Sequence, residues 1–184
     1  MRVIACAGGG RTRLEERPQP RPGPGELLLA IDATGLCGTD LFKLRFDTAP
    51  PGAVLGHEIV GTVVALGSAV QLFAVGDRVV VPHHVACGSC ALCQRDSPTL
   101  CAIFKENLLD PGGFSDSVRV SARALPRAAR RLPAGMSLEA AVFLEPTACV
   151  LRGIARAQLP PAGAGASAVI LGAGSMGLLH LLSL

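Results

Sequence analysis

The sequence predicts a β-rich first domain followed by the opening of an α/β unit. Three observations lead to this fold class. Short apolar segments separated by glycine and proline fill the first part of the chain, cysteines gather between residues 87 and 101, and a glycine-rich turn follows an apolar segment near residue 170. Strand-like segments followed by an α/β pattern are typical of two successive domains. We therefore assign residues 1–152 to the first domain and 153–184 to the beginning of the second.

The β-rich assignment rests on segments taken in chain order. We expect a strand at the N-terminus, a polar loop, and a Pro/Gly-rich turn over residues 18–25. Apolar or alternating segments predict further strands over residues 26–32, 59–66, 78–82 and 114–120. Gly76 and Asp77 form a tight-turn pair just before one of them.

Helix is expected only late in the chain. Ser137 can cap a helix over residues 138–144, with Glu139 in its first turn. Residues 160–167 are rich in proline, glycine and alanine, which predicts a flexible hinge. An apolar strand over 168–171 and an apolar helix over 178–184 should follow.

Composition excludes several classes of function. The sequence has 184 residues, 49% of them hydrophobic, which is ample for a core. The net charge of +3 comes from scattered arginines, and the absence of Tyr and Trp argues against nucleic-acid binding. The N-terminus lacks the apolar run of a signal peptide. We expect a cytoplasmic protein that does not bind membranes, although the apolar residues 162–184 must be weighed as a membrane segment.

Four cysteines form the most informative motif of the chain. Cys87, Cys90, Cys93 and Cys101 are spaced C-x2-C-x2-C-x7-C. The short gaps let neighbouring thiolates converge on one ion, and the longer gap lets a lobe fold back with the fourth ligand. Four thiolates suit a closed, tetrahedral, structural zinc site. A pair of disulfides is the alternative, but seven cysteines and a reducing cytosol argue against it.

A second set of metal-ligating side chains is spread along the sequence: Cys37, His57, Glu58 and Glu145. A thiolate, an imidazole and a carboxylate are the mixed ligands of a catalytic zinc, which keeps one position for water or substrate. Taken singly, Cys37 and His57 could be core residues and the glutamates surface carboxylates. Their occurrence together with the four-cysteine motif favours a catalytic zinc.

The glycine-rich turn matches G-x-G-x-x-G and consists of Gly172, Ala173, Gly174, Ser175, Met176 and Gly177. It follows the apolar segment 168–171 and opens an apolar helix, which is the context that gives this motif meaning. The glycines allow a tight turn, close approach of a pyrophosphate, and helix–strand packing, with the anion at the helix N-terminus. We therefore predict an NAD or NADP site and prefer it to a membrane segment.

The chain resembles the zinc-dependent medium-chain alcohol/polyol dehydrogenase family. The resemblance rests on GHEIVGTVVALGSAV at residues 56–70, CGTD at 37–40, GDRV at 76–79, the four-cysteine motif and GAGSMG at 172–177. It covers the chain from about residue 25 to the end, and Glu145-Pro146 is similar to the sorbitol and threonine dehydrogenase branch. It implies a GroES-like barrel joined to a Rossmann domain.

The resemblance also implies residue roles. Cys37 and His57 match ligands of the catalytic zinc, and either Glu58 or Glu145 can complete the site. Thr39 matches the hydroxyl that takes the alcohol proton, and Asp40 the carboxylate that orients the ligand histidine. Many relatives have a histidine three residues after this threonine, but Phe42 stands here, so the proton relay beyond Thr39 stays open.

We therefore expect a zinc-dependent oxidoreductase with two Zn²⁺ per chain that oxidises a secondary alcohol or polyol with NAD(P). The second Rossmann strand, which would decide between NAD and NADP, lies beyond Leu184. We expect the chain to be the first part of a longer dehydrogenase, inactive alone and a homodimer or homotetramer at full length. The alternatives are a non-catalytic zinc-stabilised binding module and a zinc-free relative similar to quinone reductases.

Overall fold

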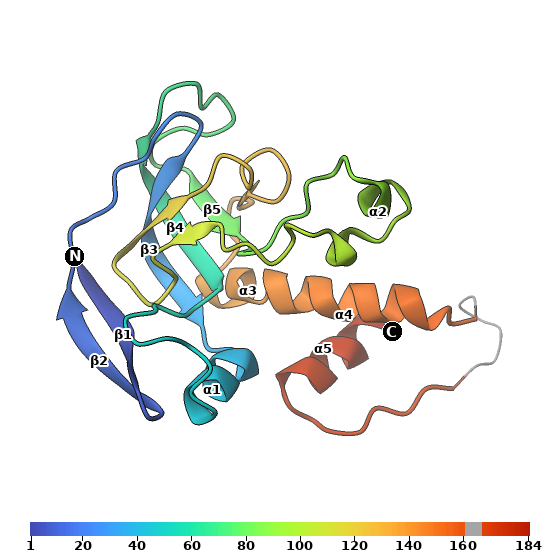
Figure 1. Cartoon of the computed structure of the whole chain (residues 1–184). Coiled ribbons are helices and arrows are strands. Elements are labelled where there is room, and N and C mark those ends of the chain that lie inside the picture. Colours follow the sequence, from blue (N-terminus) through green and yellow to red (C-terminus); the bar gives the residue numbers. More distant parts are fainter. Residues whose placement is uncertain (161–166) are drawn as a thin grey trace. The chain divides into compact units, whose positions relative to one another are not determined.

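The structure, a computed structural model, describes residues 1–160 and 167–184 (Figure 1). It divides into two compact units, Met1–Val142 and Phe143–Leu184. Most of the predicted hinge over 160–167 lies outside the described residues. The predicted domain boundary after residue 152 stays a prediction.

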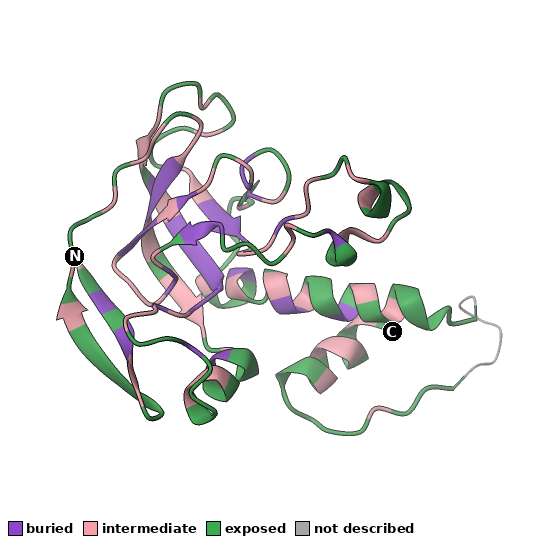
Figure 2. Ribbon diagram, viewed as in Figure 1, coloured by how far each residue is buried: buried purple, intermediate pink, exposed green. Residues whose placement is uncertain are grey.

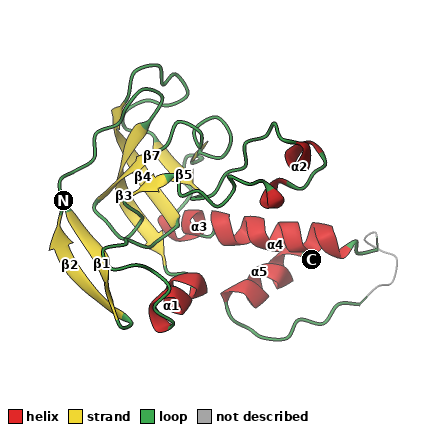
Figure 3. Cartoon of the chain, viewed as in Figure 1, coloured by secondary structure: helices red, strands yellow, loops and turns green. Residues whose placement is uncertain are grey.

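An antiparallel sheet forms the centre of the first unit, which is described throughout (Figure 3). Its strands, in spatial order, are β6 (Leu109–Asp110), β7 (Ser117–Val120), β3 (Leu27–Gly35), β4 (Glu58–Leu66), β5 (Arg78–Val81) and β8 (Arg130–Arg131). The four strands expected from apolar or alternating segments are therefore confirmed as β3, β4, β5 and β7. The predicted turn before β5 also forms, with Gly76 at a φ of +93° that favours glycine.

The predicted polar loop near the N-terminus is wrong, because its residues form a strand. β1 (Arg2–Gly8) and β2 (Arg11–Glu16) pair as an antiparallel hairpin. The side chains of β2 are mostly exposed, and Leu14 is 70% exposed. Strand formation here depends on backbone pairing with β1 rather than on an apolar face, so hydrophobic alternation gave no signal for it.

The core lies between the curled strands of the large sheet and the loops that close over it (Figure 2). Its fully buried side chains include Leu27 and Leu29 of β3, Ile59 of β4 and Val118 of β7. Burying one such side chain contributes about 1.5–3 kcal/mol. The sheet therefore has a hydrophobic core of its own, independent of any metal site.

The first unit also contains short helices, and the regular elements of the second unit are helices. The helices are α1 (Gly38–Arg45), α2 (Ala91–Gln94), the 3-10 helix η1 (Pro98–Leu100), α3 (Leu138–Val142), α4 (Leu144–Ala157) and α5 (Ser175–Ser183). The predicted cap is confirmed, since the Ser137 hydroxyl accepts a hydrogen bond from the Ala140 N–H at 3.2 Å. The helix ends at Val142 instead of residue 144, and α4 was not predicted.

The predicted strand over residues 168–171 is wrong for this structure, which shows no regular secondary structure there. Val169 is 85% exposed and Leu171 is 94% exposed. A parallel strand is stable only when it is paired and covered on both faces. Among the described residues of the second unit no other strand is present, so this segment has nothing to pair with.

None of the helices in the described residues has the length and apolar character needed to cross a membrane.

Candidate metal centres and nucleotide turn

The four predicted cysteine ligands converge in the loop that carries α2 and η1. Their sulfur atoms all lie within 4.8 Å of one another. The Sγ of Cys93 lies 3.8 Å from that of Cys87 and 3.5 Å from that of Cys90. These separations are much longer than a disulfide bond of about 2.05 Å. The disulfide alternative therefore does not apply to this cluster, in which all four cysteines are free.

The arrangement of these thiols fits a tetrahedral zinc ion. Zinc binds cysteine sulfur at about 2.3 Å, so the sulfur atoms of an ideal tetrahedron lie about 3.8 Å apart. The two measured separations match this edge closely. Gly88 supports the geometry, because its φ of +77° turns the chain between the first two ligands.

Backbone N–H groups stabilise the thiolate form of Cys87. The Sγ of Cys87 accepts hydrogen bonds from the N–H of Ser89 at 3.4 Å and from that of Cys90 at 3.3 Å. These bonds, together with the Ser89 hydroxyl, lower the pKa of Cys87 to about 5. Partial burial and the neighbouring thiol of Cys90 raise the pKa of Cys93 to about 11. A metal ion that binds Cys93 must therefore displace the proton of its thiol.

The second cluster is created by the register of β3 and β4. These antiparallel strands pair Gly35 with Glu58, so the end of one strand meets the start of the other. Cys37 follows β3 and His57 precedes β4. The ligand atoms of Cys37, His57 and Glu58 consequently lie within 4.8 Å of one another, with His57 and Glu58 buried. The structure thus brings three of the four predicted ligands together, and their binding of zinc stays a prediction.

Asp40 lies directly behind the histidine, as the resemblance implied. It is 1% exposed, and its Oδ1 is 3.4 Å from the Nδ1 of His57. The same carboxylate accepts hydrogen bonds from the N–H groups of Cys37 at 3.2 Å and Gly56 at 3.4 Å. Because Nδ1 faces Asp40, the imidazole presents its other nitrogen, Nε2, to a metal.

The same contact sets the charge of this pair. Hydrogen bonding to Asp40 raises the pKa of His57 to about 9, against the opposing effect of burial. Burial alone would raise the pKa of Asp40, but the His57 contact and the two backbone N–H groups hold it below its ordinary value. Without metal the imidazole is therefore protonated at neutral pH. A metal ion must displace that proton, so metal binding strengthens as pH rises.

Gly35 is a supporting residue that the sequence alone did not single out. A Cβ added at this position would lie 2.1 Å from Oε2 of Glu58 and 2.9 Å from its Cβ. A larger residue would therefore push the Glu58 side chain away from the cluster. Its signal in the sequence is the glycine that ends an apolar strand two residues before Cys37.

Thr39 and Phe42 both lie on α1, the helix that Cys37 caps. The Sγ of Cys37 accepts a hydrogen bond from the Thr39 N–H at 3.4 Å, which fixes the start of the helix beside the cluster. Thr39 is exposed. Phe42 is 55% exposed and packs against Phe46, with ring centroids 4.6 Å apart.

Glu145, the other carboxylate predicted for this site, belongs to the second unit. It lies in the first turn of α4, where its Oε1 is 3.8 Å from the Sγ of Cys149. Its part in metal binding stays a prediction.

The predicted nucleotide turn leads into α5. Gly172 has a φ of +107°, and a Cβ at Gly177 would lie 2.0 Å from the Gly172 carbonyl oxygen. The first glycine therefore makes the turn, and the third lets the helix pack closely against it. Gly174 caps α5 without a side-chain hydrogen bond, and a Cβ there would meet nothing within 4 Å. Ser175 and Met176 form the first residues of the helix, whose N-terminus suits an anion.

Two adjacent histidines, His83 and His84, were missed by the sequence reasoning. β4 and β5 pair Ile59 with Val81, so the residues just outside this pair, His57 and His83, also meet. Their ring centroids are 4.4 Å apart, and those of His83 and His84 are 3.6 Å apart. Burial, with the charges of His84 and His57, lowers the pKa of His83 to about 3. The signal available in the sequence was the pair of adjacent histidines shortly before Cys87.

These histidines line a pocket of about 270 Å³ beside the second cluster. Asp40, His57 and His83 contribute to its wall, together with the loop before β4. A molecule in this pocket would therefore contact the histidine that carries the candidate metal. Of the three residues in the cluster only His57 lines this pocket, together with Asp40, which contacts Nδ1 of His57.

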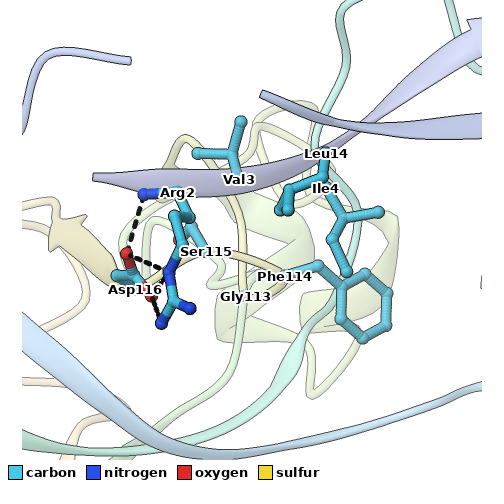
Figure 4. Close-up of a pocket in the computed structure, with 8 residues that line it drawn as sticks. All are labelled: Arg2, Val3, Ile4, Leu14, Gly113, Phe114, Ser115 and Asp116. Carbon is cyan, nitrogen blue, oxygen red and sulfur yellow. Dashed lines mark hydrogen bonds and ion pairs between the residues drawn. The ribbon is translucent and has the colours of Figure 1, made fainter. Parts of the chain in front are cut away.

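Another hollow, of about 320 Å³, lies against the β1–β2 hairpin (Figure 4). Its polar groups are already paired, because the guanidinium of Arg2 binds the carboxylate of Asp116 at 2.9 and 3.2 Å. The rest of the wall is mainly apolar, with Ile4, Leu14 and Phe114. This hollow offers no free group for catalysis.

Comparison with known families decides the identity of the fold. The model of the alcohol dehydrogenase GroES-like domain matches residues 23–130. The chain belongs to this family. The relatives that match the chain are zinc-dependent medium-chain dehydrogenases. The fold class and the family expected from the sequence are therefore confirmed.

Individual relatives agree with this assignment. The chain is 36% identical over 188 residues to D-altritol 5-dehydrogenase from Agrobacterium fabrum, an alignment that covers 100% of the chain and 54% of the relative. It is similar to an alcohol dehydrogenase from Thermus sp. ATN1, with 33% identity, a TM-score of 0.82, and coverage of 98% of this chain and 54% of that one. A zinc-binding dehydrogenase from Sinorhizobium meliloti bound to NADP gives 32% identity and a TM-score of 0.80, covering 97% and 51%. The GroES-like chain thus spans about half the length of the relatives it matches.

Proposed function

We propose that this chain forms the catalytic domain of a dehydrogenase that oxidises a secondary alcohol or polyol with NAD or NADP. The observation that carries the proposal is the presence of two different donor sets in the first unit. One consists of four thiols, whereas the other combines a thiol, an imidazole and a carboxylate beside a pocket. The first set suits a structural zinc and the second a catalytic zinc.

The protein residues have separate tasks in this reaction. Zinc supplies Lewis acidity that lowers the pKa of an alcohol, and NAD(P) serves as the oxidant. Cys37 and His57 would hold the metal, and Asp40 fixes the ring orientation of His57 through its Nδ1. The exposed Thr39 accepts the alcohol proton on its hydroxyl and passes it toward solvent. The glycine turn before α5 would hold the pyrophosphate of NAD(P) at the helix N-terminus.

The number of bound zinc ions tests this proposal against the binding module. We expect two zinc ions per chain by atomic emission after dialysis, because the two clusters share no ligand. One zinc ion per chain, held by the four cysteines alone, would contradict the catalytic site and favour a zinc-stabilised module. A chain without zinc would favour the relative similar to quinone reductases.

Thr39 is expected to matter through its hydroxyl. In the complete enzyme, Thr39→Val should retain both zinc ions and the fold but lower kcat by about 10²–10⁴, the usual effect of losing a proton-transfer group. Thr39→Ser keeps the hydroxyl and should retain most activity.

Phe42→His provides a second measurement, since a histidine bordering the relay should add a titration near pH 6.5 to the pH–rate profile. Equal rates for the Thr39→Val variant and the parent would assign Thr39 a purely structural role.

Glu58 and Glu145 compete for the role of carboxylate ligand. Glu58 already lies within 4.8 Å of the Cys37 and His57 ligand atoms. If it is the resting ligand, Glu58→Ala should lower the zinc content of the second site, whereas Glu145→Ala should keep the metal and only reduce the rate. Zinc analysis of the two variants side by side distinguishes the assignments. Loss of metal in Glu145→Ala alone would make Glu145 the resting ligand.

A further inference from the structure

The pocket beside His57 has an unusual complement of cationic side chains. Lys43, on α1, and Lys105, which follows η1, both line it. They are the only two lysines in the whole sequence, whose other cationic side chains are arginines and histidines. The fold thus brings together both lysines from distant parts of the chain.

Neither lysine forms an ion pair with another described residue. The ion pairs in the described part of the chain involve arginines or His57, and none includes Lys43 or Lys105. The one carboxylate among the lining residues is Asp40, which is buried and engaged with His57 and two backbone N–H groups. The pocket therefore has a positive charge that no carboxylate in its wall neutralises.

The positive charges of the two lysines both act on the side chain of His84. Burial lowers the pKa of His84, and the charges of Lys43, His57 and Lys105 lower it further. His83, next to it, has an Nδ1 that is buried and has no hydrogen-bond partner among the described residues. Lys43 is partly buried and Lys105 is exposed, and an anion bound in the pocket would offset the repulsion between their like charges.

We propose that this pocket binds an anionic group, a phosphate or a carboxylate, carried by the substrate alcohol. The inference rests on the proposed function, because it assigns the substrate class of the same site. Lysine ammonium groups are mobile point charges that serve well as phosphate and carboxylate ligands. Lys43 and Lys105 hold the anionic end of the substrate while its hydroxyl lies toward His57. A neutral polyol would leave both ammonium groups without a partner.

Anion binding can be measured directly on the zinc-loaded chain. Inorganic phosphate and acetate are titrated separately at constant ionic strength, and ¹H–¹⁵N spectra report the residues that respond. We expect saturable shifts at Lys43, His84 and Lys105. Either Lys43→Gln or Lys105→Gln should weaken binding about tenfold, the usual size of one charge-assisted contact. The relative affinity for the two probes distinguishes a phosphate from a carboxylate.

Two further variants separate the pocket from general charge and from the metal. Arg45→Gln removes the same charge from α1 at a residue that does not line the pocket, and it should change the affinity less than twofold. Cys37→Ser lacks the second zinc, and phosphate should still bind it. If phosphate binding instead depends on that zinc and is insensitive to both lysine substitutions, the anion is a metal ligand and the inference is overturned.

The complete enzyme gives a result that distinguishes this inference from the proposed function. We expect a higher kcat/KM for phosphorylated or carboxylated alcohols than for neutral polyols, with the difference reduced at least tenfold in Lys43→Gln through KM. Equal turnover of neutral polyols in parent and Lys43→Gln, without preference for anionic alcohols, overturns the inference and leaves the proposed function standing. Failure to oxidise any alcohol overturns both.

Discussion

Cys90→Ser is expected to empty the four-cysteine site and to unfold the lobe around α2 and η1. The lobe has little core of its own, and its helices contain no buried residue. Metal binding therefore supplies most of the folding free energy of the lobe. In small zinc modules the apparent free energy of zinc binding is on the order of 10 kcal/mol. The sheet has an independent hydrophobic core, so only part of this loss appears as global stability.

Zinc content and thermal unfolding measure this effect together. We expect one zinc ion fewer per chain and a Tm lower by roughly 5 °C or more, since about 2 kcal/mol corresponds to this shift in a chain of this size. Gln94→Ala, a substitution at an exposed position of α2, the helix that begins after Cys90, is the control and should change neither quantity. Full zinc content with an unchanged Tm in Cys90→Ser would rule out a structural zinc at these cysteines.

His57→Ala should remove the second zinc ion while the four-cysteine site keeps its own. In the complete enzyme, loss of Lewis-acid activation should lower turnover by at least about 10³, equivalent to roughly 4 kcal/mol of barrier. The substitution also leaves the buried Asp40 without its imidazole partner, which costs about 1–3 kcal/mol of stability. Activity must therefore be compared after the folded fraction has been measured.

Cys37→Ser avoids that complication. Serine is a favourable N-cap residue, so α1 should keep its start while the metal loses its thiolate ligand. We expect the same loss of zinc and turnover as in His57→Ala, with a smaller change in Tm. His180→Ala, at a histidine of α5, is the matched control for zinc content. Retained turnover in a zinc-depleted variant would refute the proposed mechanism.

Local patterns were sufficient for most of the first unit. Apolar runs and glycine punctuation predicted β3, β4 and β5, because burial on a pleated sheet selects such residues directly. The Ser137 cap was predicted because its hydrogen bond to Ala140 is local. β2 was missed because its stability comes from pairing with β1, and the segment 168–171 was assigned to a strand that requires a neighbour.

The sequence by itself determined which four cysteines come together in the loop around α2 and η1. All four thiols lie within fifteen consecutive residues, so their spacing limits the ways in which they can converge. The glycine turn was likewise readable, because a positive φ at Gly172 and close packing at Gly177 are properties of a short segment. Residues that act together within one short segment can therefore be recognised from their spacing in the sequence.

Only the tertiary structure decided what surrounds the cluster of Cys37, His57 and Glu58. The register of β3 against β4 sets Gly35 beside Glu58, and the register of β4 against β5 sets His83 beside His57. The same folding brings Lys43 and Lys105 into one pocket. Such long-range pairs depend on the alignment of whole strands, and a slip of one residue would turn their side chains to the opposite face. No local pattern contains that alignment.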